Sequence, residues 1–142
     1  MRRARFGHGE RGSVSLELAI LAPALLLLLG ALVLAGRVET SSAAVEQAAR
    51  AAARDASLTR TADTARATAT TSAQRELAAS HCASTQITVD TTGFAAPLGV
   101  DAAISVQVVC VVSLADLAIP GLPGSHTITG QATSPLDRYR SR

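Results

Sequence analysis

The sequence contains no lysine and no tryptophan, and aromatic residues make up only 2% of its 142 positions. Aromatic side chains bury more apolar area than any others, so their scarcity leaves the soluble part of the chain with a thin core. All 13 basic residues are arginine, and the formal net charge is only +2. So small a positive charge does not favour nucleic-acid binding, and we expect no nucleic-acid partner.

The sequence also lacks the short motifs that mark common catalytic sites. It has no G-x-S-x-G, no P-loop, no C-x-x-C and no H-E-x-x-H. His81, Cys82, Cys110 and His126 are a conceivable set of metal ligands, but their spacing matches no familiar metal site. The aspartates are scattered through predicted helices and turns, where solvation and capping are their ordinary roles. We therefore expect no enzymatic activity, no cofactor and no metal.

What the sequence does contain is one long apolar run near its N-terminus. Leu18 to Gly36 are 19 residues without a charge. As a helix they extend about 28 Å, close to the hydrocarbon thickness of a bilayer. Four arginines precede the run: Arg2, Arg3, Arg5 and Arg11. This bias predicts a single-pass membrane protein with a cytoplasmic N-terminus and an extracytoplasmic C-terminal domain.

A carboxylate, Glu17, directly precedes this apolar run. A charge at the centre of a membrane helix costs roughly 2.5–3.5 kcal/mol on insertion scales, and less near an end. Two ordinary interpretations of the segment stay open. One is a cleaved signal peptide with a small-residue exit at residues 33–36. The other is an uncleaved anchor in which Glu17 reaches the cytoplasmic interface.

Helical and strand patterns divide the rest of the chain. Residues 37–57 lack Gly and Pro and predict a helix that continues the membrane helix, with Glu46 and Arg50 as an i,i+4 pair. Residues 62–79 predict a second helix. Alternation of apolar residues then predicts strands at 85–90, 102–114 and 126–132. Loops with Gly and Pro between them are typical of an antiparallel meander with the long strand in the middle.

The two cysteines, Cys82 and Cys110, both lie in the predicted extracytoplasmic part, where the environment is oxidising. A disulfide between them is therefore expected. Cys110 shares the apolar face of the central predicted strand, and Cys82 follows the second predicted helix. We expect the bridge to attach the end of that helix to the strand. The closed loop of 29 residues corresponds to about 3.5 kcal/mol in the loop-entropy description.

These elements define an α+β fold class. We expect an N-terminal transmembrane helix that continues into an extracytoplasmic helix, then a second helix, then a small three-stranded antiparallel sheet with one disulfide. The chain divides into a basic leader (1–12), the transmembrane helix (13–36), an Ala-rich helical region (37–80), and a small antiparallel sheet domain with a polar tail (81–142).

The stretch RGSVSLELAILAPALLLLL resembles the N-terminus of the TadE-like pseudopilins. These are minor-pilin-like proteins of Tad/Flp pilus systems, a branch of the type IV pilin class. The resemblance rests on Arg11 and Gly12 at the end of a basic leader, on Glu17 after four further residues, and on an apolar helix that carries Pro23. The Ala-rich stretch after the membrane segment and the two late cysteines are also similar to the family.

This resemblance implies cleavage by a prepilin peptidase between Gly12 and Ser13, which makes Glu17 the fifth residue of the mature chain. Leu18 stands where the family often has an aromatic residue. The expected partners are the membrane, other pilus or pseudopilin subunits, the pilus assembly machinery and the prepilin peptidase. In a stack of parallel helices, Glu17 can pair with the new amino terminus of a neighbour, which offsets the cost of burying its charge. The alternative is a secreted or membrane-anchored small binding domain with no filament role.

Overall fold

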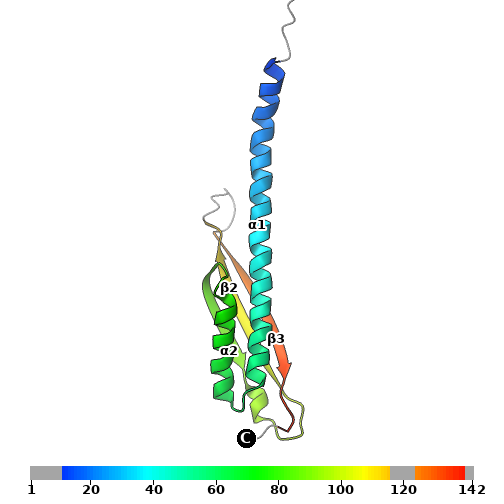
Figure 1. Cartoon of the computed structure of the whole chain (residues 1–142), viewed down its shortest axis with the longest axis vertical. Helices are drawn as coiled ribbons and strands as arrows, with labels where there is room; N and C mark the ends of the chain where they lie inside the picture. The colour runs from blue at the N-terminus through cyan, green and yellow to red at the C-terminus, as the bar shows by residue number, and fades with distance from the viewer. Residues whose placement is uncertain (1–10, 116–123, 140–142) are drawn as a thin grey trace, which may run out of the picture. The chain divides into compact units, whose positions relative to one another are not determined.

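The computed structural model describes residues 11–115 and 124–139, with the side chains of residues 11–16 excepted. Most of the basic leader, residues 1–10, and the end of the polar tail therefore lie outside the described residues. The chain forms two compact units, the first ending at Gly36 and the second beginning at Arg37. The described elements are α1 (Arg11–Ser57), α2 (Ala62–Leu77), β1 (Cys82–Asp90), the 3-10 helix η1 (Thr92–Ala95), β2 (Ala103–Ser113) and β3 (Ser125–Pro135) (Figure 1).

The sheet has three antiparallel strands in the order β1-β2-β3, so the long second strand lies in the middle as predicted. The α+β class, with a long N-terminal apolar helix, a second helix and this sheet, is thereby confirmed. β1 begins at Cys82, three residues before its expected start, and β3 continues to Pro135, three residues past its expected end. These extensions consist mostly of Ser, Thr and Ala, whose backbone groups pair within the sheet. They show no alternation of apolar and polar residues, so the sequence pattern did not predict them as strand.

One face of the sheet forms the core of the second unit. Alternate residues of β2 from Ile104 to Val112 are at most 1% exposed. The intervening residues of β2 are half-buried or exposed, so the opposite face of the strand is open. The helices add mostly alanine to this core: Ala48, Ala49, Ala52, Ala53, Ala56, Ala65, Ala69 and Ala73. Small side chains allow the helices to lie close to the strands, which is how a chain with so few aromatics builds a dense interior.

The C-terminal part of α1 and α2 are joined by polar contacts through Asp55. Its carboxylate accepts a hydrogen bond of 2.6 Å from Ser72 Oγ and forms a 3.5 Å ion pair with Arg75. α2 begins after Thr61, whose hydroxyl caps the helix by accepting from the backbone N–H of Thr64 at 3.2 Å. The predicted i,i+4 ion pair between Glu46 and Arg50 is also present.

α1 approaches the sheet closely at Gly130, in the middle of β3. A Cβ at this position would lie 2.9 Å from the backbone oxygen of Val45, which is itself fully buried in α1. The Val45 oxygen belongs to the backbone of α1, and Gly130 belongs to the backbone of β3. A Cβ at position 130 therefore fits only if the helix moves away from the strand.

We therefore expect Gly130→Ala to lower the free energy of unfolding by about 1–3 kcal/mol, the usual cost of overpacking a dense interior. Chemical denaturation of the full chain in detergent measures the change. Gly124→Ala is the matched control, because a Cβ at Gly124 meets no atom within 4 Å. Equal stability of the two variants would contradict the close packing of α1 on β3.

Candidate functional site

The first unit presents an apolar helical surface that the described residues leave exposed. In α1 beyond Glu17, an 18-residue window has a mean hydropathy of 2.8, and none of it is buried. Leu26 and Leu27, for example, are 69% and 68% exposed. By length and composition this helix is able to cross a membrane, in accord with a single-pass membrane protein.

The residues expected to act in processing and assembly lie at the start of the same helix. Because α1 begins at Arg11, the bond between Gly12 and Ser13 falls in its first turn, where backbone N–H groups have no partner within the helix. Glu17 is exposed and comes four residues after Ser13, about 6 Å farther along the axis and on nearly the same face. Pro23 lies inside the helix. The roles of Gly12, Ser13 and Glu17 stay predictions.

The disulfide between Cys82 and Cys110 is present, with the Cα atoms 5.4 Å apart. Its place in the fold differs from the expectation that it attaches a helix end to the central strand. Cys82 is the first residue of β1, so the bridge joins two neighbouring strands. In the register of these strands, Cys82 pairs with Val112 and Cys110 pairs with Thr85. The register shifts between Cys82 and Ser84, and this irregularity brings Cys82 beside Cys110. The bridge thus fixes an irregular strand end.

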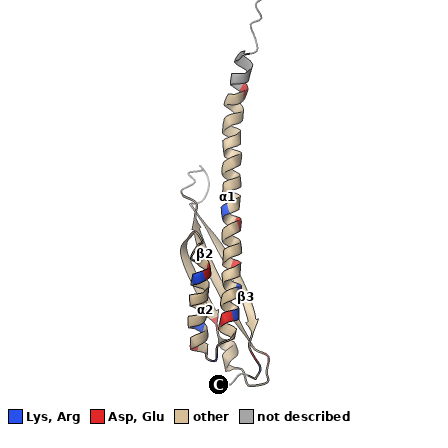
Figure 2. Cartoon of the chain, in the orientation of Figure 1, with Lys and Arg blue, Asp and Glu red and all other residues tan. Residues whose placement is uncertain are grey.

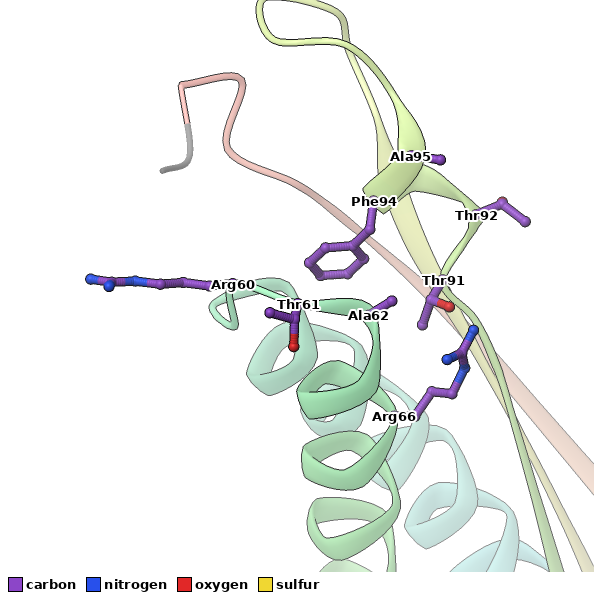
Figure 3. Close-up of a pocket in the computed structure, with 8 residues that line it drawn as sticks. All are labelled: Arg60, Thr61, Ala62, Arg66, Thr91, Thr92, Phe94 and Ala95. Atoms are coloured by element: carbon purple, nitrogen blue, oxygen red, sulfur yellow. The ribbon is translucent and has the colours of Figure 1, made fainter. Parts of the chain in front are cut away.

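The second unit has a cavity of about 470 Å³ at the turn between α1 and α2. Figure 3 shows the ring of Phe94, from η1, beside Thr61 and the turn at Arg60, with the guanidinium of Arg66 on the side of Thr91. The backbone N–H of Thr92 donates a 2.9 Å hydrogen bond to Asp90 and lowers the pKa of that carboxyl. The cavity is thus lined by one aromatic ring and two arginines, of which Arg60 extends away from the ring and Arg66 forms a 2.9 Å ion pair with Asp63.

Sequence reasoning did not identify this cavity, because α2 and η1 are separated by β1 and meet only in the folded chain. The same end of the unit carries Leu58, Leu98, Val100 and Tyr139, which are 50–82% exposed. A hydrogen bond from Gly99 N to the carbonyl of Arg138 ties two of these segments together. These are the large exposed apolar residues of the described part of the second unit.

The metal ligands considered from the sequence do not converge. Cys82 and Cys110 are consumed by the disulfide, and His81 and His126 are both exposed. Across residues 11–115 and 124–139, no group of three or more His, Cys, Asp or Glu side chains is placed to hold a metal ion.

These features define a class of protein: one apolar N-terminal helix able to span a membrane, joined to a small disulfide-bonded α+β unit. The family model described as TadE-like protein matches residues 12–54, which include Glu17 and end within α1. The resemblance of the chain to TadE-like proteins is thereby confirmed. Comparisons with curated proteins and with solved structures find no match.

Proposed function

We propose that this chain is a membrane-anchored structural pseudopilin that takes part in assembling a Tad/Flp-type pilus or a related secretion apparatus. The observation that carries the proposal is the TadE-like match over residues 12–54, which includes both Glu17 and the uncovered apolar helix. Similarity to this family supports membrane association with a pilus system. A structural role also suits a helix whose apolar stretch after Glu17 is left exposed by the described residues.

Processing is the first step that this role requires. A prepilin peptidase would cut between Gly12 and Ser13, at the start of α1, and leave the apolar helix as the anchor. The cut removes four Arg and one Glu, so the formal net charge falls by three, from +2 to −1. It also creates a cationic amino group at Ser13, because an α-amino group has a pKa near 8.

Assembly would then be favoured by pairing this amino group with Glu17 of a neighbouring copy. Two parallel helices place these groups level when one is shifted along the axis by about 6 Å, the rise over four residues. In the membrane, the lone carboxylate of a monomer is costly, whereas a paired one is much less so. The cost that Glu17 adds to the monomer therefore becomes a preference for association in one register.

The remaining features support an extracytoplasmic location for the second unit. The arginine-rich leader favours a cytoplasmic N-terminus, and the Cys82–Cys110 disulfide suits an oxidising compartment. In this arrangement, the prepilin peptidase acts on the cytoplasmic side while the sheet unit is displayed on the other.

We expect the mature protein in its native host to begin at Ser13. N-terminal sequencing of membrane-extracted protein measures this directly, and a strain without the prepilin peptidase is the control, in which the chain should keep its leader. A start at Gly36 would indicate an ordinary signal peptide. A start at Met1 in the wild-type strain would indicate an uncut anchor, and either result would contradict processing as a pseudopilin.

The alternative, an anchored small binding domain without a filament role, is favoured by one observation. The second unit contains the 470 Å³ cavity lined by Phe94, Arg60 and Arg66. Such a site has no need of cleavage at Gly12 or of a carboxylate at Glu17. The two functions therefore predict different results for substitutions at Gly12 and Glu17. The pseudopilin role predicts a loss of cleavage or assembly, and the binding-domain role predicts no effect.

A further inference from the structure

The cavity beside Phe94 combines cationic and hydroxyl groups with an aromatic ring. Its lining contains two arginines and three threonines but no Asp or Glu. Figure 2 shows the charged residues of this unit mainly on the helices and connecting segments, which are also the elements that line this cavity. Its volume of about 470 Å³ lies within the range of small-molecule sites, roughly 300–1,000 Å³. All of its lining residues belong to the second unit, so the site is formed within that unit alone.

Thr91 presents an unpaired hydroxyl group to this cavity. The residue is only 5% exposed, yet its side-chain oxygen forms no hydrogen bond within the described part of the chain. Among the described residues, no fully buried side-chain oxygen or nitrogen lacks a hydrogen-bond partner. The Thr91 hydroxyl is therefore not sealed inside the protein, and it opens into the cavity that Thr91 lines. A largely buried polar group without a protein partner is satisfied by water or by a ligand.

The start of α2 borders the same space. Thr61 caps the helix and Ala62 is its first residue, and both line the cavity. The backbone N–H groups of Thr64 and Ala65 bond back to Thr61. Those of Ala62 and Asp63 donate no hydrogen bond within the described residues. Free N–H groups at the start of a helix carry a partial positive charge and favour an anion.

Arg66 adds a full positive charge about one turn into the same helix. It forms a 2.9 Å ion pair with Asp63, but the two side chains are 54% and 95% exposed. An ion pair so exposed contributes little, so an anion in the cavity can replace Asp63 as the partner of Arg66 at small cost. Figure 3 places the Arg66 guanidinium on the side of Thr91, whereas Arg60 extends away from the ring. Arg60 therefore adds to the positive potential at the rim without a contact of its own.

We propose that this cavity binds a small organic anion, in which a carboxylate or a phosphate group is attached to a flat apolar body. The acidic group accepts hydrogen bonds from the Thr91 hydroxyl and the Arg66 guanidinium beside the start of α2, which is the geometry that oxyanions favour. The apolar body packs against the ring of Phe94. The nearby carboxylate of Asp90 accepts a hydrogen bond from the backbone N–H of Thr92 and does not itself line the cavity.

Titration of the full chain in a zwitterionic detergent tests the proposal. Phenyl phosphate and benzoate are the probes, and the tighter of the two identifies the acidic group that the cavity prefers. Benzyl alcohol is the control, because it has the same ring without the charge. We expect saturable binding of at least one acid by calorimetry and none of the alcohol. In NMR spectra, the bound acid should shift the amide signals at the start of α2 and in η1.

Two substitutions locate the bound anion. Arg66→Gln and Thr91→Val should each weaken the binding of that acid about tenfold, the loss expected for one hydrogen bond to a charged group. Arg54→Gln is the matched control, because it removes an exposed arginine of α1 that does not line the cavity, and it should bind as the wild type does. Circular dichroism checks that each variant is folded. If Thr91→Val does not fold, Arg66→Gln and the NMR shifts of the wild type decide the question.

The proposal is overturned if neither acid binds saturably or if the alcohol binds equally well. It is also overturned if the NMR shifts fall outside the cavity, or if Arg66→Gln binds the acid as tightly as Arg54→Gln. This inference does not rest on the proposed function. A mature N-terminus at Ser13 and an effect of Glu17 on assembly are measured separately, and neither depends on the outcome of the titrations.

Discussion

Glu17→Gln is expected to abolish co-isolation of the mature protein with other pilus subunits, while its amount in the membrane stays the same. Glutamine at this position costs less than a lone carboxylate during membrane insertion, so export and anchoring should be at least as efficient. What the variant loses is the partner charge for the amino group at Ser13 of a neighbouring copy. Breaking one side of a buried ion pair costs about 3–5 kcal/mol, which lowers association more than about a hundredfold.

Two further variants make this expectation specific. Glu39→Gln removes the same charge from an exposed position of α1 beyond the apolar segment and should co-isolate as the wild type does. Glu17→Asp keeps a carboxylate on a shorter side chain and should recover part of the association. Normal co-isolation and normal pili with Glu17→Gln would instead assign Glu17 to the membrane interface, as a tolerated charge without a role in assembly.

The elements that the sequence predicts well are those whose signals are local. The uncharged run after Glu17 and the absence of Gly and Pro from 37–57 were enough to predict one long helix, because helix formation depends on neighbouring residues. The alternation from Ile104 to Val112 likewise identified β2 and its buried face. Both patterns are clear because the first segment is uniformly apolar and the buried face of β2 fills the core.

The features that escaped prediction depend on contacts between distant parts of the chain. The cavity beside Phe94 forms where η1 meets the start of α2, and no local pattern marks either lining segment. The start of β1 at Cys82 was missed because the strand shifts register there, which interrupts the alternation. The need for glycine at 130 exists only because Val45 packs against it from 85 residues away.

The candidate assembly site is the opposite case, since the sequence suggested it and folding adds little to it. Gly12, Ser13 and Glu17 lie on one helix, within seven residues of its start. The match to TadE-like protein over residues 12–54 covers the same segment, and the roles of its residues stay predictions. In the proposed role, a second molecule completes this site, so a single folded chain has no further partner to add to it.

Removing the disulfide is expected to produce the largest loss of stability in the second unit. Cys82 and Cys110 are 28 residues apart, and closing a loop of this length stabilises the folded state by about 3.5 kcal/mol in the loop-entropy description. Small domains are stable by only about 5–15 kcal/mol, and the alanine-rich interior has few large side chains to compensate. The double variant Cys82→Ala with Cys110→Ala adds the loss of packing around Cys110, which is fully buried.

Chemical denaturation of the full chain in detergent, with and without a reducing agent, separates these two effects. The reductant should lower the unfolding midpoint of the wild type and leave that of the double variant unchanged, since only the wild type has a bridge to break. Any further difference between the reduced wild type and the double variant then measures the packing of the two sulfur atoms. A wild-type midpoint that does not respond to complete reduction would show that β1 and β2 hold their register without the bridge. The irregular strand end at Cys82 would then owe its position to backbone pairing and to the Ser80 hydroxyl, 3.2 Å from the Cys82 sulfur.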